Sequence, residues 1–279
     1  MALTAGKKAI FSLAALAIVV VAAILYKTQL SKPSAALQPL VIGMSPSFAK
    51  TLQVAADEAK QQGLDVKLVE FSDWNTPNIT LNHGDIDANF FQHQPFLDNT
   101  LRETGFKLKA FATGAASHVG LYSKKYHALA DLPQAARVVV PNDPFNQGRA
   151  LLLLQQAKLI QLKDANNSLS TLADIVQNPK DLQFIEVEGP QTARALDDAD
   201  LAFGYPHYLR LAKTADPESA LIFDDTTNNR YAILFVVRDD YQDTEGRLKK
   251  FVEIYQNSPK VKASLDQEFG AKLWFPGWK

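Results

Sequence analysis

The stretch RVVVPNDPFNQGRALLLL, Arg137 to Leu154, contains the pattern that decides the fold. Its valine run predicts a buried strand, and the polar residues after Pro141 predict a turn. An apolar helix is expected to start near Gly148 and to reach Leu162. A strand that leads through a short turn into a helix is the basic unit of an α/β layer.

The same alternation of apolar runs and helical patterns continues on both sides of this unit. The expected strands are Leu40–Gly43, Leu64–Phe71, part of Lys107–Ser123, Phe184–Val187, Leu201–Phe203 and Tyr231–Val237. The expected helices are one carrying Phe48, Leu52 and Ala59 on one face, then Pro77–Ala88, Pro95–Gly105 and Arg247–Tyr255. This order predicts an α/β fold with largely parallel sheets. About 240 residues follow Pro39, which is long for one small α/β domain and indicates two lobes.

Composition excludes several classes of function. The 279 residues include 29 Lys and Arg against 30 Asp and Glu, so the net charge is −1 and no basic excess for nucleic-acid binding exists. The chain has no cysteine, which excludes disulfides, thiolate metal sites, cysteine nucleophiles and lipid attachment to cysteine.

The amino-terminal segment has the composition of a membrane anchor. Lys7 and Lys8 precede 18 uncharged residues, Ala9–Tyr26, which as a helix would span about 27 Å, close to a bilayer core. We therefore expect an uncleaved signal anchor within residues 1–30 and a linker at 31–39. It would place the rest of the chain outside the cytoplasm, in the periplasm and tethered to the inner membrane. A cleaved signal with its site after Ala36 and a buried globular helix are the alternatives.

Motifs for enzyme chemistry are missing. The chain has no Gly-x-Ser-x-Gly, no Walker loop, no Gly-x-Gly-x-x-Gly and no His-Glu-x-x-His, and its five histidines do not have the spacing of a metal site. The sequence therefore predicts a protein that is not an enzyme, with no catalytic residue, no metal site and no cofactor.

Two stretches remain as candidates for ligand binding. In GDIDANFFQHQPFL, Phe90, Phe91, His93 and Phe96 are expected to form an apolar cage, with ordinary core aromatics as the alternative. In the opening stretch, Asn146 is expected to cap the helix, with Arg149 in its first turn. A cation there is unfavourable against the helix dipole unless an anion joins it. A guanidinium beside backbone N–H groups makes a carboxylate receptor; a surface arginine is the alternative.

Several long runs make the chain resemble a known family. They are GDIDANFFQHQPFLD (84–98), GLYSKKY (120–126), VVVPNDPFNQGRALLLLQQAKLIQLKD (138–164), DIVQNPKDLQFIEVE (174–188), ARALDDADLA (193–202) and FPGW (275–278). In this order they resemble the substrate-binding proteins of methionine ABC importers, the MetQ/NlpA lipoprotein family. The resemblance covers nearly everything after Leu40, but the lipid-attachment cysteine usual in the family is missing.

The resemblance implies a two-lobed periplasmic binding protein, type II-like, over residues 40–279. Lobe 1 would contain about 40–121 and 220–279, and lobe 2 about 137–213. The implied function is the extracytoplasmic substrate-binding component of an ABC importer. It would deliver a small carboxylate ligand, an amino acid of the methionine class, to a permease partner. A divergent relative that acts as an envelope sensor or binding partner, with a ligand other than methionine, is the alternative.

The resemblance also assigns residues to the binding site. Phe91 and His93 match the aromatic cage, while Phe96 and Trp74 stand where the family usually has tyrosine. Arg149 matches the carboxylate receptor, with Asn146 beside it.

Two positions depart from the family's pattern. Tyr205 and Ile233 stand where asparagines usually help to hold the amino-acid backbone of the ligand. Because isoleucine can neither donate nor accept a hydrogen bond, we expect a bound ammonium to lose a partner, at a cost of about 1.5–3 kcal/mol.

Overall fold

The computed structural model describes residues 38–225 and 229–278, and Pro39–Lys279 form one compact unit. The expected membrane anchor, and the linker apart from Gln38 and Pro39, lie outside the described residues. Within the described residues, no helix is both long enough and apolar enough to cross a bilayer.

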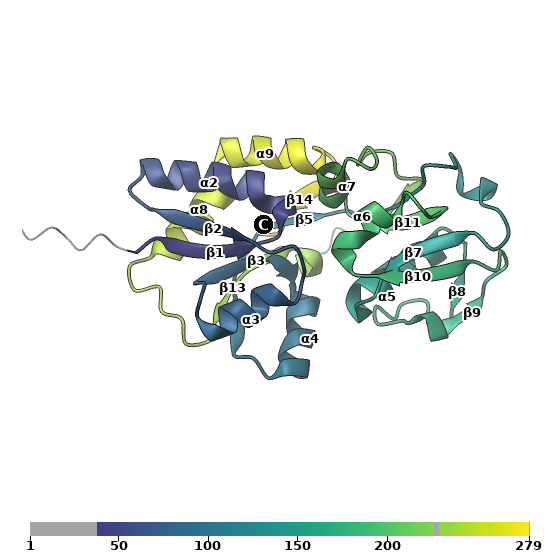
Figure 1. Ribbon diagram of the computed structural model, residues 1–279, viewed down its shortest axis with the longest axis horizontal. Coiled ribbons are helices and arrows are strands. Elements are labelled where there is room, and N and C mark those ends of the chain that lie inside the picture. The colour runs from purple at the N-terminus through teal and green to yellow at the C-terminus, as the bar shows by residue number, and fades with distance from the viewer. Residues whose placement is uncertain (1–37, 226–228, 279) are drawn as a thin grey trace, which may run out of the picture. The chain divides into compact units, whose positions relative to one another are not determined.

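The first lobe is built on a five-stranded sheet with the order β2-β1-β3-β13-β4 (Figure 1). Strand β1 pairs in parallel with β2 and β3, whereas β13 runs antiparallel between β3 and β4. The bounds are β1 Leu40–Met44, β2 Val66–Glu70, β3 Ala88–His93, β4 Leu108–Thr113 and β13 Ile233–Arg238. The late strand β13 therefore completes a sheet that the first third of the chain begins.

Helices cover both faces of this sheet. Helices α2 (Ala49–Gln61), α8 (Arg247–Asn257) and α9 (Pro259–Phe269) lie over one face, and α3 (Thr76–His83) and α4 (Gln94–Thr104) lie over the other (Figure 1). Helix α2 buries Leu52, Ala55, Ala56 and Ala59, as their helical spacing predicts.

The second lobe has its own five-stranded sheet, with the order β10-β7-β11-β6-β12. Its strands are β6 Gly120–Tyr122, β7 Arg137–Pro141, β10 Gln183–Val187, β11 Leu201–Gly204 and β12 Ile222–Phe223, and its helices are α5 Pro144–Gln156, α6 Thr192–Ala195 and α7 Pro206–Ala212. Two short ladders join β5 (Ala115–Ser117) to β14 (Trp274–Pro276) and β8 (Gln161–Leu162) to β9 (Ile175–Gln177). The remaining 3-10 turns are η1 Pro46–Phe48, η2 Leu129–Asp131, η3 Leu172–Asp174, η4 Gly189–Gln191 and η5 Asn229–Tyr231. The prediction of a two-lobed α/β fold is confirmed.

The expected limits of the lobes need correction. Residues up to 121 and from 220 onward were expected in lobe 1. However, β6 pairs with β11, and β12 pairs with β6, so Gly120–Tyr122 and Ile222–Phe223 belong to the second sheet. The chain therefore crosses between the lobes just after β5 and just before η5, because β6 pairs with β11 and β12 pairs with β6.

The expected helix near Gly148 also begins earlier than predicted. Helix α5 starts at Pro144, and the Asp143 side chain caps it by accepting a hydrogen bond from the Asn146 backbone N–H at 2.9 Å. Proline at the first helical position and aspartate before it are favourable for a helix start. Asn146 is therefore not the cap, and Arg149 lies in the second turn, not the first. The helix ends at Gln156, short of Leu162.

Two further elements differ from the sequence prediction. Helix α3 stops at His83, because Gly84 takes a left-handed conformation with φ of 87°, and the residues up to Ala88 lead into β3. Strand β13 starts at Ile233 instead of Tyr231, which lies in the turn η5.

Candidate functional site

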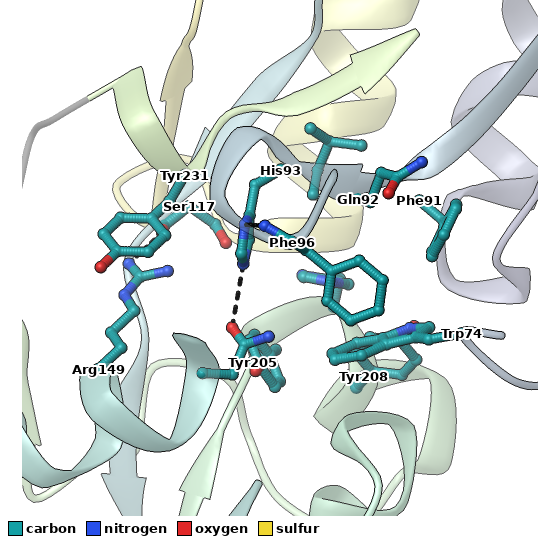
Figure 2. A pocket seen from close by; sticks show the side chains of 13 residues that line it. Trp74, Phe91, Gln92, His93, Phe96, Ser117, Arg149, Tyr205, Tyr208 and Tyr231 are labelled. Carbon is teal, nitrogen blue, oxygen red and sulfur yellow. Dashed lines mark hydrogen bonds between the residues drawn. The ribbon is translucent and has the colours of Figure 1, made fainter. Parts of the chain in front are cut away.

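A small cavity of about 30 Å³ lies where elements of both lobes meet (Figure 2). The eight residues that the family resemblance placed at the site all line it: Trp74, Phe91, His93, Phe96, Asn146, Arg149, Tyr205 and Ile233. Five lining residues were missed, namely Gln92, Ser117, His207, Tyr208 and Tyr231. Since one water needs roughly 10–15 Å³, the cavity is far smaller than an amino acid, and binding such a ligand requires side chains or lobes to move.

The carboxyl ends of strands supply much of this lining. His93 ends β3, and Tyr205 follows β11, while Asn146 lies in the first turn of the helix that follows β7. In parallel α/β sheets ligands bind beyond these strand ends. The strand order of both sheets therefore brings together residues more than one hundred positions apart.

Aromatic rings form one wall of the cavity. The Phe96 ring packs edge-on against Phe91 at 5.8 Å and against Trp74 at 5.9 Å between ring centroids. Phe90, predicted as a fourth cage residue, points to the opposite face of β3. It is fully buried in the lobe 1 core against Phe235 at 4.4 Å. Successive residues of a strand face opposite sides, which separates Phe90 from Phe91.

Trp74 connects the two lobes. Its indole Nε1 donates to the Tyr208 hydroxyl at 2.8 Å, and its backbone N–H donates to Glu188 Oε1 at 2.9 Å. The ring also lies against Gly189, where an added Cβ would come within 2.1 Å of the indole. Trp74 belongs by sequence to lobe 1, yet it packs into the hydrophobic core of lobe 2.

A second polar bridge crosses the cavity at His93. Its Nδ1 accepts from the Phe96 backbone N–H at 3.2 Å, so in the neutral ring the proton is on Nε2, which donates to Asn146 Oδ1 at 3.2 Å. The Asn146 amide donates in turn to Asp143. Burial lowers the pKa of His93 to about 4, with Arg149 adding a smaller lowering effect. His93 is therefore uncharged at neutral pH and keeps this hydrogen-bond direction.

Arg149 is already paired with a carboxylate of the chain itself. Its Nε and Nη2 donate to Asp224 Oδ2 at 3.0 and 2.6 Å, and Nη2 also donates to the Ser117 carbonyl at 3.0 Å. The Tyr231 ring covers the guanidinium at 4.2 Å. An anion beside this helix-borne cation was expected, but Asp224 was not identified as that anion. That Arg149 binds a ligand carboxylate stays a prediction.

Tyr205 and His207 each contribute a buried polar atom to the wall of the cavity. Within the described chain, the Tyr205 hydroxyl and His207 Nδ1 are buried without a hydrogen-bond partner. The His207 ring packs against Phe48 at 5.0 Å and Phe269 at 4.7 Å between ring centroids, and burial lowers its pKa to about 3. This histidine is therefore neutral and belongs to an aromatic contact between the lobes.

Ile233 lies beside His93 in the register between β13 and β3. Its backbone carbonyl accepts a hydrogen bond from the Gly114 N–H, so this carbonyl is already paired within the fold. Its side chain adds an apolar surface to the cavity.

The missed residues had weak sequence signals. His207 and Tyr208 follow Tyr205 in the run FGYPHYLR, and Tyr231 lies two residues before Ile233. Proximity to nominated positions was the signal available for these three. Gln92, between Phe91 and His93, had the same signal, whereas Ser117 had none beyond its polarity. Across the described ranges, no group of three or more His, Asp or Glu side chains has the arrangement of a metal site.

The NlpA lipoprotein family model matches residues 40–278. The chain belongs to this family. The D-methionine-binding lipoprotein MetQ of Escherichia coli K12 is 41% identical over 230 residues, which cover 81% of this chain and 82% of that protein.

Solved structures of similar proteins share the fold. A crystal structure of the methionine-binding protein MetQ has a TM-score of 0.80 and 39% identity, covering 86% of this chain and 98% of that one. A nutrient-binding protein from Burkholderia cenocepacia, bound to methionine, has a TM-score of 0.75 and 39% identity, covering 82% and 96%. The family resemblance found in the sequence is thereby confirmed.

Proposed function

We propose that this protein is the extracytoplasmic substrate-binding component of an ABC importer and that its ligand is a small molecule of the methionine class. The main support for this proposal is that one cavity between two α/β lobes is lined by every residue that the family resemblance assigned to the site. The protein binds its ligand and delivers the ligand, chemically unchanged, to a permease.

The aromatic wall supports a ligand with an apolar, polarizable chain. Trp74, Phe91 and Phe96 offer ring edges and faces, and a thioether sulfur gains about 0.3–1.5 kcal/mol against an aromatic ring. The printed names of the relatives, D-methionine-binding lipoprotein and methionine-binding protein, point to the same class. The alternative role, an envelope sensor, has no comparable support.

Bound ligand tests this proposal directly. We expect the full-length protein, purified in mild detergent, to carry one bound small molecule. Native mass spectrometry should detect this molecule on the protein and again after its release. Phe96→Ala should weaken its binding about tenfold, because burying a phenylalanine contributes about 1.5–3 kcal/mol and part of the wall remains. Val176→Ala, on the exposed strand β9, is the control and should bind as the unchanged protein does. Equal binding by both variants, or no bound molecule at all, would contradict the proposal.

We also propose that the amino-terminal segment holds the protein at the inner membrane. The proposal rests on the apolar run Ala9–Tyr26 and on the lack of a cysteine for lipid attachment. Membrane fractionation should recover the full-length chain with membranes, and deletion of residues 1–32, with a cleavable export signal in their place, should release it into the soluble periplasmic fraction. A mature chain that begins after Ala36 would show instead that the segment is a cleaved signal.

A further inference from the structure

The pair formed by Arg149 and Asp224 has the features of a permanent contact. The side chains of the two residues are 7% and 8% exposed, and the shortest N–O distance is 2.6 Å. Both contacts of the pair use the same carboxylate oxygen, Oδ2. A buried guanidinium and carboxylate at this distance attract each other strongly, because little water screens them.

The rest of the chain holds Asp224 in place for this contact. Its other oxygen, Oδ1, accepts from the Val119 backbone N–H at 3.1 Å and lies 3.1 Å from His118 Nδ1. The Asp224 backbone N–H donates to the Val119 carbonyl at 2.9 Å. The carboxylate is therefore fixed by the crossing between the lobes and does not depend on Arg149 for its position.

The remainder of the cavity lining is uncharged. Among the described lining residues, Arg149 is the one with a formal charge at neutral pH, since His93 and His207 are neutral. No lining carboxylate is available to a ligand ammonium, and Ile233 presents a hydrocarbon side chain. Asp224, which lies behind the lining, pairs with this one charged lining residue.

We propose that Asp224 acts as a built-in anion in the place of a ligand carboxylate, so that the cavity selects ligands of the methionine class whose head group is uncharged. This inference rests on the proposed function and specifies the head group of its ligand. A second carboxylate at Arg149 would lie beside Asp224, and like charges in a buried site repel each other. It would also meet a guanidinium whose Nε and Nη2 are engaged. An amide of the same shape meets no such repulsion.

Two probes of nearly the same shape, one with a charged and one with an uncharged head group, test the inference. The thioether acid 3-(methylthio)propanoate and its amide, 3-(methylthio)propanamide, share a chain and a shape, and L-methionine is the reference for the ligand class. We expect calorimetry at pH 7 on the full-length protein in detergent to show at least tenfold tighter binding of the amide than of the acid. Asp224→Asn should shift this ratio at least tenfold toward the acid, because Arg149 then lacks its anion. Asp225→Asn, an exposed neighbour with the same change of charge, should leave the ratio unchanged.

The outcomes separate the inference from the proposed function. If the unchanged protein prefers the acid, or if Asp224→Asn and Asp225→Asn give the same ratio, the inference is wrong although the methionine class stands. If none of the three thioether compounds binds, the methionine class is wrong, and the charge of the co-purified molecule decides the inference: a carboxylate overturns it and an uncharged compound supports it. Thermal unfolding shows whether Asp224→Asn is folded; if it is not, the amide-to-acid ratio of the unchanged protein decides.

Discussion

Replacing Arg149 with alanine is expected to lower the free energy of unfolding by about 3–5 kcal/mol, because the change leaves the Asp224 carboxylate buried without its partner. At about 2–4 °C for each kcal/mol in a chain of this size, the melting temperature should fall by roughly 6–20 °C. Thermal and urea unfolding of the ligand-free protein measure both quantities. An effect this large in the absence of ligand would show that the pair stabilises the fold itself.

A surface ion pair of nearly the same length is the matched control. Lys124 Nζ lies 2.7 Å from Asp197 Oδ1, but the two side chains are 46% and 53% exposed. Lys124→Ala should therefore cost no more than about 1 kcal/mol. The double variant Arg149→Met with Asp224→Asn should recover much of the lost stability, because the buried charge is gone while the asparagine oxygen can still accept from Val119. Equal costs for Arg149→Ala and Lys124→Ala would show that Asp224 is not held as the structure indicates.

Placing an alanine at Gly189 is expected to weaken ligand binding by about 1–3 kcal/mol, which is roughly 5- to 150-fold in affinity. The new Cβ would lie 2.1 Å and 2.2 Å from two carbons of the Trp74 indole, far inside contact distance. The indole must then move, and its hydrogen bond to the Tyr208 hydroxyl is lost. Calorimetry with the co-purified ligand measures the affinity.

A smaller ring at position 74 separates this clash from a general loss of stability. Combining Gly189→Ala with Trp74→Phe should bind better than Gly189→Ala alone, because the added methyl group then has space. Trp74→Phe by itself reports the cost of losing the indole hydrogen bond. If Gly189→Ala binds as tightly as the unchanged protein, the close contact between Trp74 and Gly189 is not needed in the liganded state.

Local patterns in the sequence determined the fold class, and the family resemblance assigned most of the site. The alternation around Arg137–Leu154 predicts the strand and helix that became β7 and α5. The eight nominated residues line one cavity because they follow or lie near the carboxyl ends of strands, which the family resemblance had already marked. The fold class depends on residues within a few positions of each other, so periodicity and turn chemistry suffice to predict it, whereas the site residues were assigned by the family resemblance.

The tertiary structure alone decided which residues pair across the chain. Arg149 and Asp224 are 75 positions apart, and Trp74 reaches Tyr208 across 134 positions. The pairing of β6 and β12 within the second sheet brings Asp224 to Arg149, and that pairing has no local signal because the two strands are only three and two residues long. A helix-borne arginine attracts an anion wherever one is close, so its charge predicts that a partner exists. Which carboxylate it meets, and whether that carboxylate belongs to the ligand or to the chain, depends on the path of the backbone between the lobes.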